Sequence, residues 1–268
     1  MAVVSLGIFI VAVNTTASED AVVSFVIEGL ASPEVTGWLH YTYLLALAPL
    51  LVIAGRLGDV FGKEHLYAYG FGLLAIGSVL FGLAPRFSWL VAFRAVQAVG
   101  AAAVLSLGIA LLVEAFPRPE RGSALGVAVS VGLVGSVLGS LLVDGLGWTW
   151  VSFGTVPIAL VGILACRRFI LANPPSDEQR FDLAGAILLA ASMVCLILGL
   201  GLGLQNGYTD SWVMLLLTLS VLVFTNFVWI ESRVDHPLLD LAMFKNLDFS
   251  VGLLTGFIVG VALTAASG

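Results

Sequence analysis

The amino-acid sequence predicts an all-α membrane protein, on three observations. Of the 268 residues, 60% are hydrophobic and 10% are charged, whereas a soluble domain carries about 25% charged residues. The mean hydropathy is correspondingly high, at +1.09. The apolar residues gather in runs of about 20, the helix length that spans the hydrocarbon core of a bilayer. The net charge of −6, with no basic stripe, gives no indication of a nucleic-acid partner.

Apolar segments follow one another along the chain, and each is predicted to be a membrane helix. The segments are 5–29, 37–54, 66–84, 89–113, 123–143, 150–166, 183–204, 212–231 and 249–268. Cys166 and Cys195 fall in separate segments and form no metal-binding spacing. The sequence also holds no zinc spacing, nucleophile triad or phosphate-binding loop. We therefore expect no cofactor, no metal and no enzymatic activity.

The basic residues predict the orientation of these segments. With a cytoplasmic N-terminus, the outer loops hold only Arg86, and Arg94 lies inside a segment. The other basic residues all fall in inner loops: Arg56, Lys63, Arg118, Arg121, Arg167, Arg168, Arg180, Arg233 and Lys245. All six tryptophans lie at segment ends, as in an interfacial aromatic belt. Both patterns indicate a multi-pass protein of the cell membrane with its N-terminus in the cytoplasm.

A charged, glycine-rich stretch at 55–66 joins the second and third segments. Two membrane-length helices joined by so few residues form a tight hairpin, and glycine tolerates the backbone conformations that such a turn needs. We expect Asp59 to hold the turn by accepting hydrogen bonds from nearby backbone amides or a basic residue. The alternative is a charged loop that only fixes topology.

Four stretches of the chain resemble a known family, the major facilitator superfamily. Residues 55–63 are similar to its G-x-L-x-D-x-x-G-[RK] loop between helices 2 and 3. Residues 94–102 are similar to its R-x-x-Q-G-x-G-A-A motif, with alanine at one glycine. Residues 148–158 and 236–246 resemble stretches of its fourteen-helix drug:proton antiporter branch.

The resemblance implies a particular division of the chain. A six-helix N-terminal bundle is followed by two linker helices and by the first helix of an incomplete C-terminal bundle. The expected divisions are a bundle at 1–168, a cytoplasmic linker at 169–182, a helix hairpin at 183–231, a cytoplasmic loop at 232–248 and the opening C-terminal helix at 249–268. The missing helices imply a separate C-terminal half as a partner, or a truncated chain.

The resemblance also implies roles for particular residues. Gly55, Asp59, Gly62 and Lys63 correspond to a conformational latch against the second bundle. The small residues Gly135 and Gly139 allow close helix packing. In the family, that motif lets helix 5 slide against a C-terminal helix.

Two acids in the first segment suggest a proton-coupling site. Glu19 and Asp20 lie inside an apolar run, where an unpaired carboxylate costs at least about 2.5 kcal/mol. At about 1.5 Å per residue, Glu19 and Arg94 lie at similar depths in the membrane. The functional interpretation is a protonatable pair between helices 1 and 4. The alternatives are acids hydrated near the outer interface and an Arg94 ion pair that is purely structural.

Other polar residues are candidates for a substrate cavity: Asn14, Thr16, His40, Tyr43 and Gln97. A lone histidine near a helix end is more commonly an interfacial residue, and Gln97 could bind either substrate or a neighbouring helix. Two departures from the antiporter pattern bear on function. Asn14 stands where the branch usually has an acid, and Ser136 stands where its proline is expected.

The leading hypothesis is a secondary transporter that exports amphipathic small molecules in exchange for protons. A second hypothesis is a transporter of the same fold with another substrate or direction. A third is an inactive split or truncated fragment, and an intramembrane enzyme is the least favoured. The expected partners are the lipid bilayer, protons, a small-molecule substrate and the separate C-terminal half.

Overall fold

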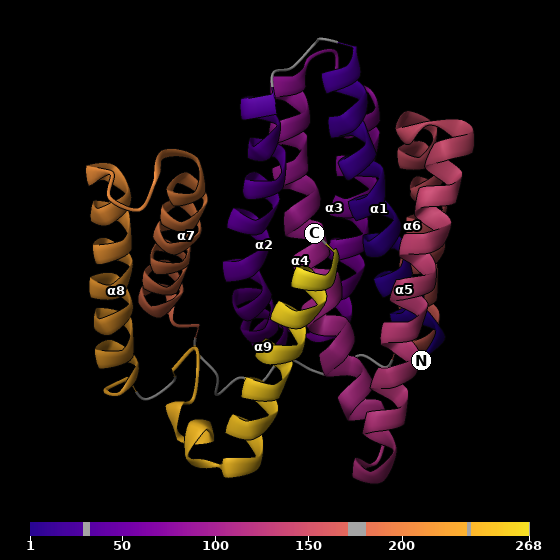
Figure 1. The fold of residues 1–268 in the computed structure, drawn as a ribbon. Coiled ribbons are helices and arrows are strands. Elements are labelled where there is room, and N and C mark those ends of the chain that lie inside the picture. The colour runs from indigo at the N-terminus through magenta and orange to yellow at the C-terminus, as the bar shows by residue number, and fades with distance from the viewer. Residues whose placement is uncertain (29–32, 171–180, 235–236, 268) are drawn as a thin grey trace.

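The structure is a computed structural model that describes residues 1–28, 33–170, 181–234 and 237–267. Within those residues the chain is helical, with no strand (Figure 1). The helices are α1 (Ala2–Ile27), α2 (Pro33–Phe61), α3 (Lys63–Gly82), α4 (Phe87–Ala115), α5 (Arg121–Leu146), α6 (Trp148–Phe169), α7 (Leu183–Asn206), α8 (Ser211–Glu231) and α9 (Leu247–Ser267), with short 3-10 helices η1 (Arg118–Glu120) and η2 (Leu241–Lys245). Each predicted segment corresponds to one α-helix among the described residues.

Helices α1 to α6 pack into one bundle, with α3 and α4 in the closest association. Small residues allow this approach. A Cβ added to Gly100 of α4 would stand 2.6 Å from the backbone nitrogen of Leu74 in α3. The core between these helices contains Tyr67 and Phe71, whose rings meet edge to face at 5.2 Å. A membrane helix bundle lacks a hydrophobic driving force between its helices, so such close packing is a main source of its stability.

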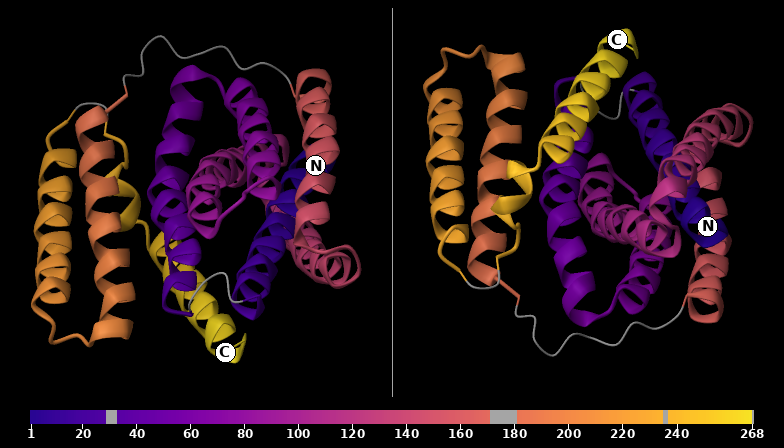
Figure 2. Two further views of the ribbon diagram at one scale, coloured as in Figure 1. Left: turned by 90° about the horizontal axis from the view of Figure 1, so that it is seen from above. Right: turned by 90° about the horizontal axis from the view of Figure 1, so that it is seen from below.

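Helices α7 and α8 form a hairpin that stands beside the bundle and touches it through α2 (Figures 1 and 2). At one end of this contact, the Tyr41 hydroxyl donates to the backbone oxygen of Gly201 at 3.4 Å. At the other end, Val52 and Ile53 of α2 pack against a buried apolar cluster that includes Ala186 of α7. We propose that this hairpin is the linker unit expected at 183–231. The linker expected at 169–182 and His236 lie largely or wholly outside the described residues.

The stretch at 55–66, expected as the turn between the second and third helices, is almost entirely helical. Helix α2 continues to Phe61, α3 begins at Lys63, and Gly62 alone breaks the helical path. Its backbone has φ 95° and ψ 123°, a conformation that L-residues with a side chain rarely adopt. The prediction that α2 ends near residue 54 is therefore wrong. Charged residues end a hydrophobic run at the edge of the membrane without ending the helix.

Helix α9 extends away from η2, in yellow in the figures, and crosses in front of the bundle in Figure 1. Its apolar side chains Leu253, Leu254 and Ile258 are more than half exposed. Most of the contacts of this helix are with η2. The contacts within the chain therefore do not account for the apolar surface of α9.

Candidate functional site

A buried polar cluster lies where α1, α2, α3 and α4 meet. Each of its side chains is at most 7% exposed. We call it the Arg94 cluster, and its members are Asn14, Tyr43, Ser78, Arg94 and Gln97. The cluster brings together four of the residues that the sequence singled out, and Ser78 is an addition.

Hydrogen bonds connect the Arg94 cluster across three helices. The side-chain oxygen of Asn14 accepts hydrogen bonds from Ser78 Oγ at 3.0 Å and from Gln97 Nε2 at 3.4 Å. Arg94 Nη1 donates to Gln97 Oε1 at 3.1 Å and to the backbone oxygen of Asn14 at 3.4 Å. Asn14 therefore links α1 by hydrogen bonds to both α3 and α4.

The positive charge of Arg94 is met by dipoles and by an aromatic ring. Its guanidinium carbon lies 3.8 Å from the ring centre of Tyr43, a cation–π contact. The ion pairs found among the described residues do not include Arg94, so the structure shows no direct pair with Glu19 or Asp20. The residue of α1 beside Arg94 is Asn14, and Glu19 lies about 7.5 Å further along the helix axis.

Glu19 nevertheless reaches the neighbourhood of Arg94. A small cavity of about 20 Å³ is lined by Ser18, Glu19, Val22, Leu39, His40 and Arg94. A cavity that holds one water molecule needs only about 10–15 Å³ of this volume. Glu19 itself is exposed, as is His40. The cavity is therefore bordered by both an accessible carboxylate and the buried guanidinium, and it is large enough for one water molecule.

Asp20 and Thr16 face another helix. The Thr16 hydroxyl lies 3.5 Å from the backbone oxygen of Ser136 in α5, and Asp144 of α5 acts electrostatically on Asp20. Successive residues of an α-helix are rotated by about 100°, which separates Asp20 from Glu19. The sequence suggested one proton-coupling site that contains both acids, and the structure divides Glu19 and Asp20 between two neighbouring faces of α1.

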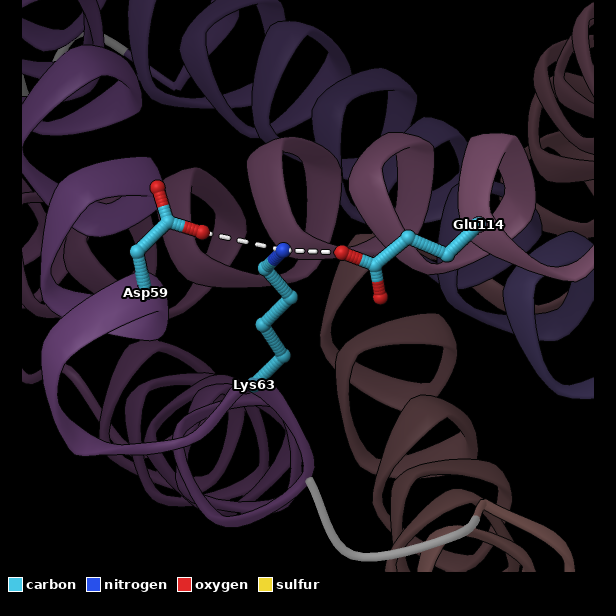
Figure 3. Close-up of polar contacts among 3 residues, drawn as sticks. All are labelled: Asp59, Lys63 and Glu114. Atoms are coloured by element: carbon cyan, nitrogen blue, oxygen red, sulfur yellow. Dashed lines mark hydrogen bonds and ion pairs between the residues drawn. The ribbon is translucent and has the colours of Figure 1, made fainter. Parts of the chain in front are cut away.

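A second set of polar residues lies at the end of the bundle where α2 joins α3, and we call it the Lys63 network. Lys63 Nζ lies 2.9 Å from a carboxylate oxygen of Asp59 and also forms an ion pair with Glu114 of α4 (Figure 3). The basic residue expected to hold Asp59 is thus Lys63. This network joins the ends of three helices.

Glycines allow α2 to approach α4 beside the Lys63 network. A Cβ on Gly58 would overlap Leu107, and one on Gly55 would stand 3.0 Å from Ser106 Oγ. The glycine spacing that marked this stretch therefore has two uses. Gly62 makes the turn, and the other two glycines make the contact with α4.

Gly135 and Gly139 lie against α1. A Cβ on Gly135 would stand 2.9 Å from the backbone oxygen of Phe9, and one on Gly139 would stand 3.2 Å from Cα of Val13. These two glycines are the reason that α5 and α1 pack closely. The sliding contact with a C-terminal helix, implied by the family resemblance, stays a prediction.

Two members of these sites were not identified from the sequence. Ser78 is a polar residue inside an apolar run, next to Gly77, and that polarity was the available signal. Glu114 stands just beyond the end predicted for the fourth segment. Which helix each side chain faces depends on helix rotation, and the hydrophobic pattern of a fully buried helix does not reveal it.

The helices define the class of protein. Eight of the helices in the described residues are long and apolar enough to cross a membrane. Together with a polar cluster enclosed among them, they identify a multi-pass helical membrane protein. Residues 3–268 match the profile of a family that is described as "Major Facilitator Superfamily". The chain belongs to the Major Facilitator Superfamily.

Individual relatives agree with this assignment. "Multidrug resistance protein 3" of Bacillus subtilis (strain 168) is 29% identical over 263 residues, which are 95% of this chain and 51% of that protein. The "Tetracenomycin C resistance and export protein" of Streptomyces glaucescens is 32% identical over 255 residues, which are 93% of this chain and 47% of that protein. The chain spans about half the length of these curated relatives.

A solved structure has the same fold. The crystal structure of the human organic anion transporter MFSD10 superposes with a TM-score of 0.56 and 16% sequence identity. The match covers 73% of this chain and 53% of that chain. At this level of identity, the likeness concerns the arrangement of helices and not the substrate.

Proposed function

We propose that the chain forms the N-terminal bundle of a secondary transporter that exports amphipathic small molecules in exchange for protons. The names of the two relatives, one for multidrug resistance and one for export, support this proposal. We place the transporter in the cell membrane, with its N-terminus in the cytoplasm. The basic residues that favour the inner side support this orientation. The α7–α8 hairpin supports a place in the fourteen-helix branch.

The observation that carries the proposal is the cavity between Glu19 and the Arg94 cluster. An ionised Glu19 attracts the buried guanidinium, and a protonated Glu19 does not. Proton binding to Glu19 therefore changes the net charge near Arg94. The hydrogen bonds from Arg94 to Asn14 and Gln97 then stabilise the guanidinium in a different electrostatic environment. Because the bond from Arg94 to the backbone oxygen of Asn14 connects α4 to α1, protonation shifts the balance of contacts between the two helices. A change of this kind is what couples a proton to rearrangement of a bundle.

The Lys63 network is our candidate for the conformational latch. In transporters of this fold, one bundle of helices rocks against the other about a central site. A charged network that joins the ends of α2, α3 and α4 fixes the surface that a second bundle would meet. This role needs that second bundle, and the relatives are about twice as long as the chain. We propose a C-terminal half as its partner.

Transport in inverted native membrane vesicles tests the proposal, since any partner chain is present there. The probe is ethidium, an amphipathic fluorescent cation, with and without an imposed pH gradient. We expect gradient-driven accumulation that Glu19→Gln lowers by at least tenfold. The matched control is Asp20→Asn, an acid of the same helix that faces α5, and it should retain most activity. Equal loss in both variants would contradict a specific role for Glu19.

A second candidate is a transporter of this family that is not coupled to protons. The observation that favours it is Asn14, which cannot ionise and stands at the centre of the Arg94 cluster where the antiporter resemblance expects an acid. Accumulation that is unaffected by the pH gradient and by Glu19→Gln would support this candidate. Absence of transport in native vesicles would instead support an inactive chain.

A further inference from the structure

A second pair of acids lies outside the six-helix bundle, at the joint between the hairpin and α2. Asp182 caps α7, because its Oδ1 accepts a hydrogen bond from the backbone nitrogen of Gly185 at 2.9 Å. Glu231 ends α8 and is only 3% exposed. Its Oε1 accepts a hydrogen bond from the backbone nitrogen of Leu238 at 3.2 Å. Each carboxylate thus accepts a hydrogen bond from the backbone.

The two carboxylates converge on Gly185. A Cβ added to this glycine would stand 2.5 Å from Asp182 Oδ2 and 2.7 Å from Glu231 Oε1. The two oxygens therefore lie no farther apart than the sum of these distances. Any larger residue at position 185 would force the carboxylates apart. Glycine at this position therefore allows the two carboxylates to lie close together.

One oxygen of each carboxylate is buried without a hydrogen-bond partner. These oxygens are Asp182 Oδ2 and Glu231 Oε2. The surroundings are apolar, since the buried residues of this joint include Ala186, Leu189 and Phe227. A buried carboxylate oxygen that no donor serves is unfavourable, and a bound cation removes that cost.

The charges of the joint indicate the valence of that cation. Among the described residues, the charged groups that act on Glu231 are Asp182, with the same sign, and Arg56 of α2, with the opposite sign. Two carboxylates and one guanidinium sum to a single negative charge. One monovalent cation neutralises this group, whereas a divalent ion would leave it positive.

We propose that Asp182 and Glu231 bind one monovalent cation between them, either a proton or a sodium ion. The site connects the first turn of α7 to the last turn of α8, beside Arg56 of α2. Occupancy relieves the repulsion between the two acids and so holds α7 and α8 together at the base of the hairpin. The site is independent of the Arg94 cluster, which lies among α1 to α4.

Infrared spectroscopy and thermal unfolding of the full chain in detergent test the proposal and separate the two cations. A bound proton gives the C=O stretch of a protonated carboxyl group at neutral pH, and Glu231→Gln and Asp182→Asn each abolish it. A bound sodium ion gives no such band. Instead, the unfolding midpoint of the wild-type chain rises with NaCl when choline chloride keeps the ionic strength constant, and both variants lose this dependence.

The matched control is Asp210→Asn. Asp210 caps α8 as Asp182 caps α7, by accepting from the backbone nitrogen of Trp212 at 2.9 Å, and the Asn side chain preserves the cap. This variant should retain the band or the sodium dependence. Gly185→Ala, which keeps both acids and separates them, should abolish either signal. The proposal is overturned if the wild-type chain shows neither signal, or if the signal survives Glu231→Gln and Asp182→Asn.

Discussion

Arg94 is held by a geometry that only a guanidinium can satisfy. One of its nitrogens binds both Gln97 and the backbone of Asn14, while its plane lies over Tyr43. Lysine keeps the charge but not the planar fork or the stacking. We expect Arg94→Lys to lower the free energy of unfolding by about 2 kcal/mol, the value of a hydrogen bond to a charged group.

Unfolding of the purified chain in mixed micelles measures this change. The control is Arg121→Lys, because Arg121 is partly exposed and makes one bond, from Nε to the backbone oxygen of Phe116. It should change stability by less than about 0.5 kcal/mol. Equal stability of Arg94→Lys and the wild-type chain would show that the charge alone is sufficient.

Ser78 contributes to the Arg94 cluster through a bond that crosses between helices. Its hydroxyl donates to the side chain of Asn14, so Ser78→Ala leaves a buried acceptor with one donor fewer. Interhelical bonds in membranes average about 0.6 kcal/mol, with a maximum near 1.7. We expect a loss in that range. The control is Ser220→Ala, which is also a buried serine but donates within its own helix to the backbone oxygen of Leu217. If both variants lose the same stability, the interhelical bond contributes nothing.

At the scale of the element, the contact of α3 with α4 depends on glycine. Alanine at Gly100 would place a methyl group 2.6 Å from the backbone of Leu74, and backbone atoms cannot move aside as a side chain can. We expect Gly100→Ala to destabilise the chain by about 1–3 kcal/mol. Gly126→Ala on α5 meets no atom within 4 Å and should be neutral or slightly stabilising. Thermal unfolding of both variants measures the contrast.

Variants of the Lys63 network can test transport with little effect on stability, because the acids of the network are exposed. Asp59 and Glu114 are about 40% exposed, and exposed ion pairs contribute only about 0–1 kcal/mol. Asp59→Asn should therefore leave membrane insertion and the unfolding midpoint nearly unchanged. If the network is a latch, the same variant should lower ethidium transport severalfold in native vesicles. Unchanged transport would remove the latch role, and Glu120→Gln on η1 serves as the surface control.

The helices of this chain could be predicted from the sequence, and their partners could not. Long apolar runs identify each helix, because length and composition decide whether a segment spans a membrane. The same runs carry almost no periodic signal, so the face that each residue presents stays hidden. This is why Glu19 and Asp20 were expected to act together. For the same reason, the residue pattern did not predict that Asp182 and Glu231, which are far apart in the sequence, lie close together.

In the whole molecule, polar side chains join helices at two places. The Lys63 network joins helices within the bundle, and the Asp182–Glu231 pair joins α7 to α8 of the hairpin, beside Arg56 of α2. Both lie where α2 ends, since Arg56 and Asp59 are less than one turn apart on that helix. Movement of the end of α2 would therefore affect both joints together.

The orientation of the whole molecule in the membrane is a separate prediction, and it follows from charge. The connection between α4 and α5 carries Arg118 and Arg121, whereas the connection between α7 and α8 carries no basic residue. Membrane insertion keeps basic loops in the cytoplasm. In a background with both native cysteines replaced by alanine, a cysteine at Thr209 should react with a membrane-impermeant thiol reagent in intact cells. A cysteine at Glu120 should react only after the cells are permeabilised. Labelling in the reverse order would invert the topology and place the Lys63 network on the outer surface.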